Sequence, residues 1–154
     1  VLDERVNYAN GYFGTCSSPA PGFCSDTNPP AAPPGCSISC VRDFDTGTFN
    51  DHASNVAGIV LGVAPDTRVA SLNVFRNDGY AYSDRIIQAI NWCITNKSAY
   101  NIVTMNLSLG GGGSSTPCSG DVFATPIANA RSAGILAAIA SGNNGYTNQI
   151  SSPV

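Results

Sequence analysis

Residues 51–59 read Asp51-His52-Ala53-Ser54-Asn55-Val56-Ala57-Gly58-Ile59 and contain the only histidine of this 154-residue chain. Apolar side chains recur at helical spacing from Val56 to Leu61, so we expect a packed helix that begins at His52 and ends near Gly62. A histidine in the first turn of such a helix is exposed yet firmly held, as a general base must be. The stretch therefore predicts both an element of the fold and a candidate catalytic base.

The rest of the chain alternates between strand-like and helix-like segments. Strands are expected at 69–75, 102–109 and 135–140, and helices at 83–97 and 121–133. Ser83 is expected to cap the first of these helices, and Gly134 to follow the second. Two of the strands are continuous and apolar, as strands buried on both faces are. The alternation predicts an α/β fold in which crossover helices connect the strands of a parallel sheet.

The composition excludes several classes of protein. Hydrophobic residues make up 43% of the chain and charged residues 11%, which argues against disorder. Seven basic against ten acidic residues give a net charge of −3, so we expect no nucleic-acid partner. No apolar run is long enough to span a bilayer, so no membrane partner is expected. Val1 opens the sequence without a charged leader, as in a mature or trimmed chain.

The six cysteines indicate disulfides and an oxidising, extracellular compartment. Fifteen pairings are open from sequence alone. Short loops favour Cys16–Cys24 and Cys36–Cys40, which leaves Cys93 and Cys118 to pair with each other or with a cysteine outside the chain. No cysteine pair has C-x₂-C spacing, and Cys36 and Cys40, four apart, have only one histidine in the chain to complete a zinc site. No metal and no cofactor are therefore expected.

Residues 14–40 contain no helical or alternating pattern and are expected to be an inserted loop. This segment holds four of the cysteines and most of the prolines of the chain. A long loop of this kind in a compact domain is usually functional or stapled, and the cysteines favour stapled. We therefore expect one partial domain over 1–154 with a Cys/Pro-rich insertion at 14–40.

A general base of this type needs a carboxylate on its other ring nitrogen. The candidates are Asp3, Asp43, Asp45 and Asp51. Asp3 is favoured, because it ends a short apolar start and would lie at the carboxyl end of a strand.

Two further segments follow expected strands, at the edge where parallel sheets bind ligands. Asn143 lies between glycines that let a ligand approach the backbone, and its amide can donate to a developing oxyanion. The segment Ser108-Leu109-Gly110 is not expected to bind phosphate, because no Gly-Lys-Ser/Thr follows it. As a strand edge that ends in glycines, it could instead pair with an extended peptide.

Taken together, these segments resemble the subtilisin-like serine proteases, or subtilases. His52 to Gly58 is similar to the family's His-Gly-Thr-x-Val-Ala-Gly helix start, and Gly62-Val63-Ala64-Pro65 matches the turn that follows it. Residues 106–110 look like its Asn-x-Ser-Leu-Gly strand, and 140–145 like its Ala-x-Gly-Asn-x-Gly segment. The resemblance implies that Asp3 orients the general base His52 and that Asn143 stabilises the oxyanion. It also implies that an extended peptide binds between two segments, Ser108, Leu109, Gly110 and Ala140, Ser141, Gly142.

The chain departs from the family pattern in identifiable places. Glu4-Arg5 stands where the family has Thr/Ser-Gly, and Ala53 where it has Gly, so a cation near the acid and backbone strain are expected. No serine here has the family's Gly-Thr-Ser-x-Ala setting. A sheet incomplete at both ends is therefore expected, with the nucleophile in a missing C-terminal half. The histidine helix has no room for the calcium loop of some relatives.

These features predict part of a secreted serine endopeptidase that acts on protein or peptide substrates and is inactive by itself. Two alternatives remain open at this level. One is a non-catalytic subtilase relative that binds extended peptides. The other is a disulfide-rich extracellular interaction domain that uses residues 14–40.

Overall fold

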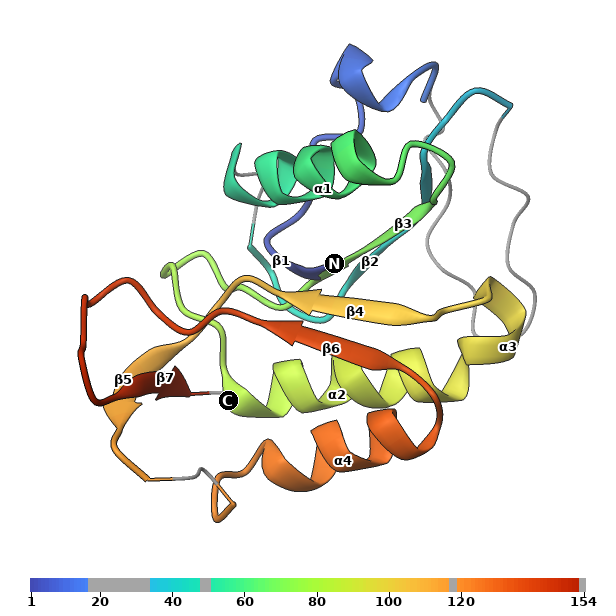
Figure 1. Ribbon diagram of the computed structural model, residues 1–154. Helices are drawn as coiled ribbons and strands as arrows, with labels where there is room; N and C mark the ends of the chain where they lie inside the picture. The colour runs from blue at the N-terminus through green and yellow to red at the C-terminus, as the bar shows by residue number, and fades with distance from the viewer. Residues whose placement is uncertain (17–33, 48–50, 117–118, 153–154) are drawn as a thin grey trace.

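A computed structural model describes residues 1–16, 34–47, 51–116 and 119–152. Its main sheet is parallel and has the strand order β2-β3-β1-β4-β6. The strands are β1 (Leu2–Asp3), β2 (Ile38–Asp43), β3 (Val69–Asn73), β4 (Thr104–Leu107) and β6 (Leu136–Ile139). The shortest strand, β1, thus lies at the centre of the sheet (Figure 1). The parallel α/β architecture expected from the sequence is confirmed.

Helices cover both faces of this sheet (Figure 1). The helix α1 (Asp51–Val63) lies on one face, and α2 (Ser83–Thr95) and α4 (Ala124–Ser132) lie on the other. The remaining elements are the short helices and a second sheet: η1 (Gly11–Phe13), α3 (Lys97–Tyr100) and the antiparallel pair β5 (Gly111–Ser114) and β7 (Ile150–Ser152). No helix in the described ranges is long and apolar enough to cross a membrane.

Each face of the sheet has its own hydrophobic core. Leu72, Met105 and Leu107 pack with Ile90 of α2 on one side. Ile38 and Val69 pack with the α1 residues Ala57 and Leu61 on the other side. Burial of an aliphatic side chain of this size contributes about 2 kcal/mol. The core therefore fixes α1, and with it the position of His52, against the strands.

Several boundaries differ from the expectations. The helix α1 passes through Gly62 to Val63, and α2 has Tyr82 rather than Ser83 at its N-cap. Asn96 separates α2 from α3, so Lys97 begins a second helix. Gly134 follows α4 with φ +77°, as expected of a residue that ends a helix in the left-handed region.

The expectation that residues 14–40 are loop is wrong at its end, because Ile38–Cys40 belong to β2. Residues 17–33 lie outside the described residues, so the structure describes only the two ends of the predicted insertion. The strand β2 pairs with β3 from Ile38 to Asp43. Its partner lies some thirty residues further along the chain, so local sequence pattern could not reveal the pairing.

The expected cysteine pairs are also wrong. Cys16 is bonded to Cys36, 20 residues away, and this pair joins the segment after η1 to the start of β2. Cys40 is disulfide-bonded as well. Cys93 is a buried free thiol, so it does not pair with Cys118, and burial raises the pKa of the Cys93 thiol to about 11.

Replacing Cys16 and Cys36 together by serine is expected to lower the free energy of unfolding by about 3 kcal/mol. The reason is that the cross-link closes a loop of 20 residues and restricts the unfolded chain. Urea unfolding at equilibrium measures the change. A denaturation midpoint equal to that of the unmodified chain would contradict the expectation.

Candidate active site

Asp3 and His52 meet at the carboxyl end of the central strand. The side chain of Asp3 is fully buried at the end of β1, and His52 lies in the first turn of α1. The Nδ1 atom of His52 is 2.9 Å from Oδ1 of Asp3, which also accepts the backbone N–H of Glu4 at 2.8 Å. The His52 side chain is 54% exposed. One side of the imidazole is therefore held by a buried carboxylate while the ring remains accessible to a reactant.

The other candidate acids have other partners. Asp43 accepts hydrogen bonds from the guanidinium of Arg5. Asp45 is paired with arginines from two other segments, and Asp51 is exposed at the start of α1. Among the four acids, only Asp3 contacts the histidine through an ion pair or hydrogen bond described here.

Ala53 and Arg5, which depart from the family pattern next to His52 and Asp3, are both accommodated by the fold. Ala53 is helical and fully buried in the core under α1. Within the described ranges Asn101 is the only non-glycine residue with a positive φ, so the backbone of Ala53 is not in the left-handed region. The expected strain at Ala53 is therefore absent. The guanidinium of Arg5 is held by Asp43 at the end of β2, so its charge is partly neutralised beside Asp3.

The predicted substrate-binding segments share the sheet edge with Asp3. Leu2 is in register with Leu107 of β4, and Leu107 with Ile139 of β6. Ser108–Gly110 and Ala140–Gly142 thus continue from two strands that lie beside β1 in order. The backbone N–H of Ala140 donates to the carbonyl of Leu107 at 3.1 Å, which keeps the two segments together as they leave the sheet.

Asn143 is exposed in the turn after β6. Because β6 is two strands from β1, the two strand axes are about 10 Å apart. Gly142 precedes Asn143 with φ +98°, and a Cβ there would overlap the side chain of Ser151. The turn that presents Asn143 therefore requires glycine and is packed against β7. Asn143 thus follows a strand at the same sheet edge as Asp3, and no hydrogen bond of Asn143 to Asp3 or His52 is present among the described residues.

A hollow of about 470 Å³ opens beside Ser108–Gly110. It is lined by Leu109, Gly110 and Gly111, by Phe75, Gly79, Tyr80 and Ala81 from the segment after β3, and by Ile86 and Phe123. The lining residues from the segment after β3 were not predicted from the sequence. The signal for them is the Asn77-Asp78-Gly79 turn after β3, which brings Ala81 back to pair with Phe75.

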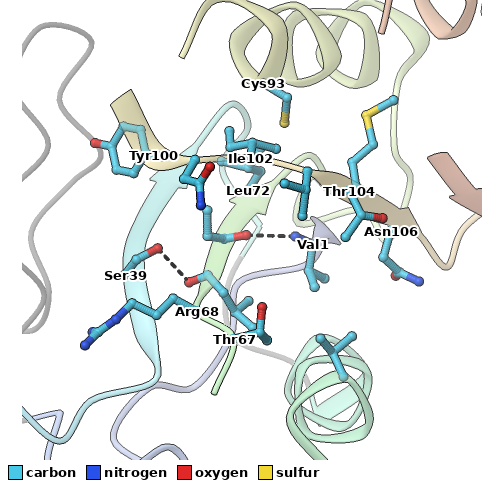
Figure 2. A pocket seen from close by; sticks show the side chains of 16 residues that line it. Val1, Ser39, Thr67, Arg68, Leu72, Cys93, Tyr100, Ile102, Thr104 and Asn106 are labelled. Atoms are coloured by element: carbon cyan, nitrogen blue, oxygen red, sulfur yellow. Dashed lines mark hydrogen bonds between the residues drawn. The ribbon is translucent and has the colours of Figure 1, made fainter. Parts of the chain in front are cut away.

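A second pocket, of about 110 Å³, lies at the opposite edge of the sheet. Its lining includes Val69 and Thr104, the first residues of β3 and β4, and the thiol of Cys93 (Figure 2). In this pocket the amine of Val1 donates to the carbonyl of Ala70 at 2.8 Å. Because Asp3 and His52 lie at the carboxyl ends of the strands, this pocket is not part of their site.

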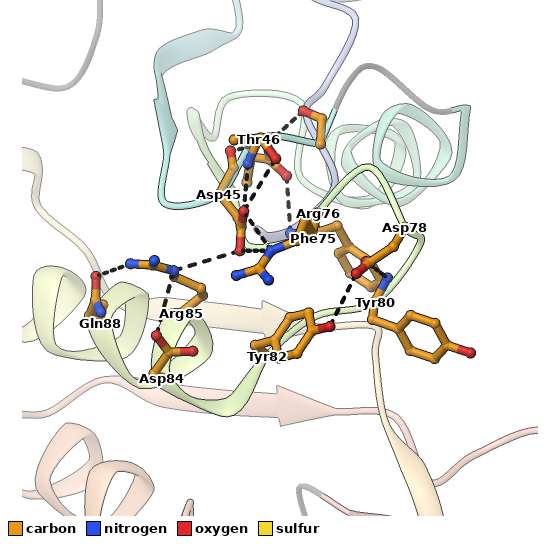
Figure 3. A network of polar contacts seen from close by, with 12 residues as sticks. Asp45, Thr46, Phe75, Arg76, Asp78, Tyr80, Tyr82, Asp84, Arg85 and Gln88 are labelled. Carbon is orange, nitrogen blue, oxygen red and sulfur yellow. Dashed lines mark hydrogen bonds and ion pairs between the residues drawn. The ribbon is translucent and has the colours of Figure 1, made fainter.

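A network of polar and charged side chains holds Asp45 and Thr46, which follow β2 (Figure 3). The carboxylate of Asp45 accepts the backbone N–H of Thr46 at 2.8 Å and lies 3.3 Å from Nε of Arg76 and 3.6 Å from Nε of Arg85. The guanidinium of Arg76 also lies 4.2 Å from the ring centroid of Tyr82. The network thus ties the end of β2 to the start of α2 and to the loop after β3.

Hydrogen bonds within this network also make the Asp45 carboxyl a stronger acid. The Thr46 N–H, and after it the Arg76 side chain, hold the pKa of Asp45 below its ordinary value. The stabilisation from a depressed carboxyl pKa is present above the unfolded value of about 3.9 and is lost as the pH falls through the folded value.

The variant Asp45→Asn should therefore be less stable than the unmodified chain near neutral pH, and the difference should shrink in acid. Urea unfolding at about pH 6 and about pH 3 measures this change. Asp84→Asn is the matched control, since Asp84 is 62% exposed and lies 3.6 Å from the same Arg85. A stability difference for Asp45→Asn that stays constant with pH would contradict the assignment.

Comparison with known proteins identifies the family of the chain. The sequence model of the subtilase family matches residues 42–154. A subtilisin-like protease of Coccidioides posadasii is 34% identical over 119 residues, which cover 75% of this chain and 28% of the relative. Subtilisin-like protease 3 of Arthroderma benhamiae is 33% identical over 118 residues, which cover 72% of this chain and 28% of the relative.

The chain thus spans about 28% of the length of these relatives. His52 and Asn143 lie within the range that the family model matches, whereas Asp3 lies before it. The contact between Asp3 and His52 therefore comes from the fold and is independent of that match. On the family match, the shared identity and the parallel α/β fold, this chain belongs to the subtilase family.

Proposed function

We propose that these 154 residues carry the acid, the base and the oxyanion donor of a secreted serine endopeptidase. Asp3 holds the imidazole of His52 in the tautomer that has its proton on Nδ1. The other ring nitrogen of His52 then accepts the proton of a serine hydroxyl as the serine attacks a peptide carbonyl. Asn143 donates its amide to the oxygen that becomes negative.

The contact between Asp3 and His52 is the observation that supports this proposal most strongly. A buried carboxylate at 2.9 Å from Nδ1, beside a ring that is more than half exposed, is the arrangement of a general base with its orienting acid. A buried structural histidine would instead be enclosed on both sides. The charge that forms on the imidazole during proton transfer is stabilised by the same carboxylate.

Peptide binding is proposed between the two segments that follow β4 and β6. Ser108, Leu109 and Gly110 form one wall, and Ala140, Ser141 and Gly142 form the other. Residues 108–110 lie between β4 and β5 and belong to neither strand, so their backbone groups can pair with an extended substrate. The apolar hollow beside Leu109 would receive a hydrophobic side chain of that substrate.

The serine nucleophile is proposed to lie outside these residues. In support, the matched part covers 28% of each of the two relatives named above, and no Gly-Thr-Ser sequence occurs among the 154 residues. We expect a fluorophosphonate probe to label a serine of the complete protein, but no serine of residues 1–154. The labelled peptide is identified by mass spectrometry, and fluorogenic peptide hydrolysis is measured in parallel. Labelling of a serine within 1–154 would overturn the assignment.

A subtilase relative that binds peptides without cutting them is the second candidate. Glu4, which follows Asp3 where the family has a hydroxyl residue, is the feature that favours it. Binding of an extended peptide by a complete protein that neither hydrolyses it nor reacts with the probe would support this alternative. Secretion is proposed for either candidate, because the Cys16–Cys36 disulfide suits an oxidising compartment.

A further inference from the structure

Glu4 places a second carboxylate at the pair formed by Asp3 and His52. We propose that Asp3, Glu4 and His52 form a binding site for a divalent transition metal such as Zn²⁺, and that the bound metal blocks His52 as a base. This inference concerns metal binding and goes beyond the proposed protease activity. It does not require that the serine or the substrate be present.

The donor atoms of the three residues already converge. One carboxylate oxygen of Asp3, one of Glu4 and a ring nitrogen of His52 all lie within 4.8 Å of one another. Ligands of a tetrahedral zinc ion are about 3.4 Å apart, given metal–ligand bonds of about 2.1 Å. The Glu4 side chain has three rotatable bonds and is only partly buried. Its rotation can shorten the distances between donor atoms to the spacing that zinc requires.

Asp3 supplies an independent observation that points to a cation at this site. Its Oδ1 atom accepts both Glu4 N–H and His52, whereas Oδ2 is buried and has no hydrogen-bond partner among the described residues. An ionised oxygen that is fully removed from water and left without a partner costs more than about 1–3 kcal/mol. A cation next to Oδ2 would remove that cost.

The type of metal follows from the donors. Two carboxylates neutralise a divalent cation, and an imidazole nitrogen favours zinc over the hard ions Mg²⁺ and Ca²⁺. The site would bind the metal through the nitrogen that faces Asp3, which is Nδ1. Exposure of the His52 ring leaves a path by which the metal can enter and leave.

Metal binding changes the tautomer of the ring without changing its charge. Coordination uses the lone pair of Nδ1, so the single proton of the neutral imidazole moves from Nδ1 to Nε2. With a proton on Nε2, His52 has no lone pair left to accept the serine proton. If the proposed protease activity is correct, removal of the metal by a chelator restores it.

The test is a titration of the chain with Zn²⁺ in competition with a chelator of known affinity. Calorimetry gives the affinity, and ¹⁵N spectra of labelled histidine report His52 without ambiguity because it is the only histidine. We expect one Zn²⁺ per chain, a shift of the Nδ1 resonance, and no shift with Ca²⁺ or Mg²⁺. The variant Glu4→Gln keeps the shape of the side chain and should weaken binding by about tenfold or more.

Asp51→Asn is the matched control, since Asp51 adjoins His52 in sequence but lies outside the cluster. Its affinity for Zn²⁺ should equal that of the unmodified chain. An unchanged His52 spectrum at saturating Zn²⁺, or equal affinities of the Glu4→Gln and Asp51→Asn variants, would overturn the proposal. These readouts involve no substrate, so failure of the protease assignment leaves them interpretable.

Discussion

Replacing His52 by alanine in the complete protein is expected to lower kcat by about a million-fold, the loss that removal of the catalytic histidine causes in subtilisin itself. Without the imidazole, no group held by Asp3 remains to accept the serine proton. The residual rate would come from substrate binding and oxyanion stabilisation alone. Hydrolysis of a fluorogenic peptide measures the loss.

The matched control is Asn55→Ala, which changes an exposed residue on the same helix less than one turn further on. Its kcat should remain close to that of the unmodified protein, and circular dichroism should show that both variants are folded. Activity of His52→Ala within tenfold of the unmodified protein would remove His52 from the mechanism. Such a result would favour the relative that binds peptides without cutting them.

Replacing Asp3 by asparagine is expected to lower kcat by about 10⁴-fold, the magnitude known for loss of the triad acid in serine proteases, subtilisin included. The asparagine can retain the position of the ring, but its amide donates to Nδ1 where the carboxylate accepted. The proton of the neutral ring then lies on Nε2, which can no longer take a proton from serine. The variant would therefore keep the position of the ring but lose its ability to act as a base.

Asp51→Asn again serves as control, because it removes an adjacent, exposed carboxylate that has no contact with Nδ1 in the structure. Steady-state kinetics with the same peptide separate kcat from KM for both variants. Equal effects of the two substitutions would mean that the buried position of Asp3 has no special role. Loss of folding in Asp3→Asn is checked by urea unfolding.

Much of the sheet could be predicted from the sequence because its strands carry local signals. Strand-like apolar segments, two of them continuous, identified β3, β4 and β6, and helix-like segments identified α1, α2 and α4. The expected order of strands and helices also placed Asp3 and His52 at the carboxyl edge of the sheet. In the structure, Nδ1 of His52 lies 2.9 Å from Oδ1 of Asp3. Apolar runs and helical periodicity are properties of the segment itself, so they can be detected in the sequence.

Features that depend on distant partners could not be predicted in this way. The strand β2 is recognised only by its pairing with β3, and β5 is a glycine-rich segment ordered by β7. The bond between Cys16 and Cys36 follows from the position of η1 beside the start of β2. The ion pairs of Asp45 likewise join segments that are about 30 to 40 residues apart.

The central claim is that Asp3 holds the neutral ring of His52 with its proton on Nδ1. A two-dimensional ¹H–¹⁵N spectrum of the histidine ring tests it directly, because the chain contains a single histidine. At a pH where the ring is neutral and with metal ions removed, we expect the proton on Nδ1, a strongly downfield proton signal, and its loss in Asp3→Asn. A neutral ring that carries its proton on Nε2, with the same spectrum in Asp3→Asn, would contradict the account.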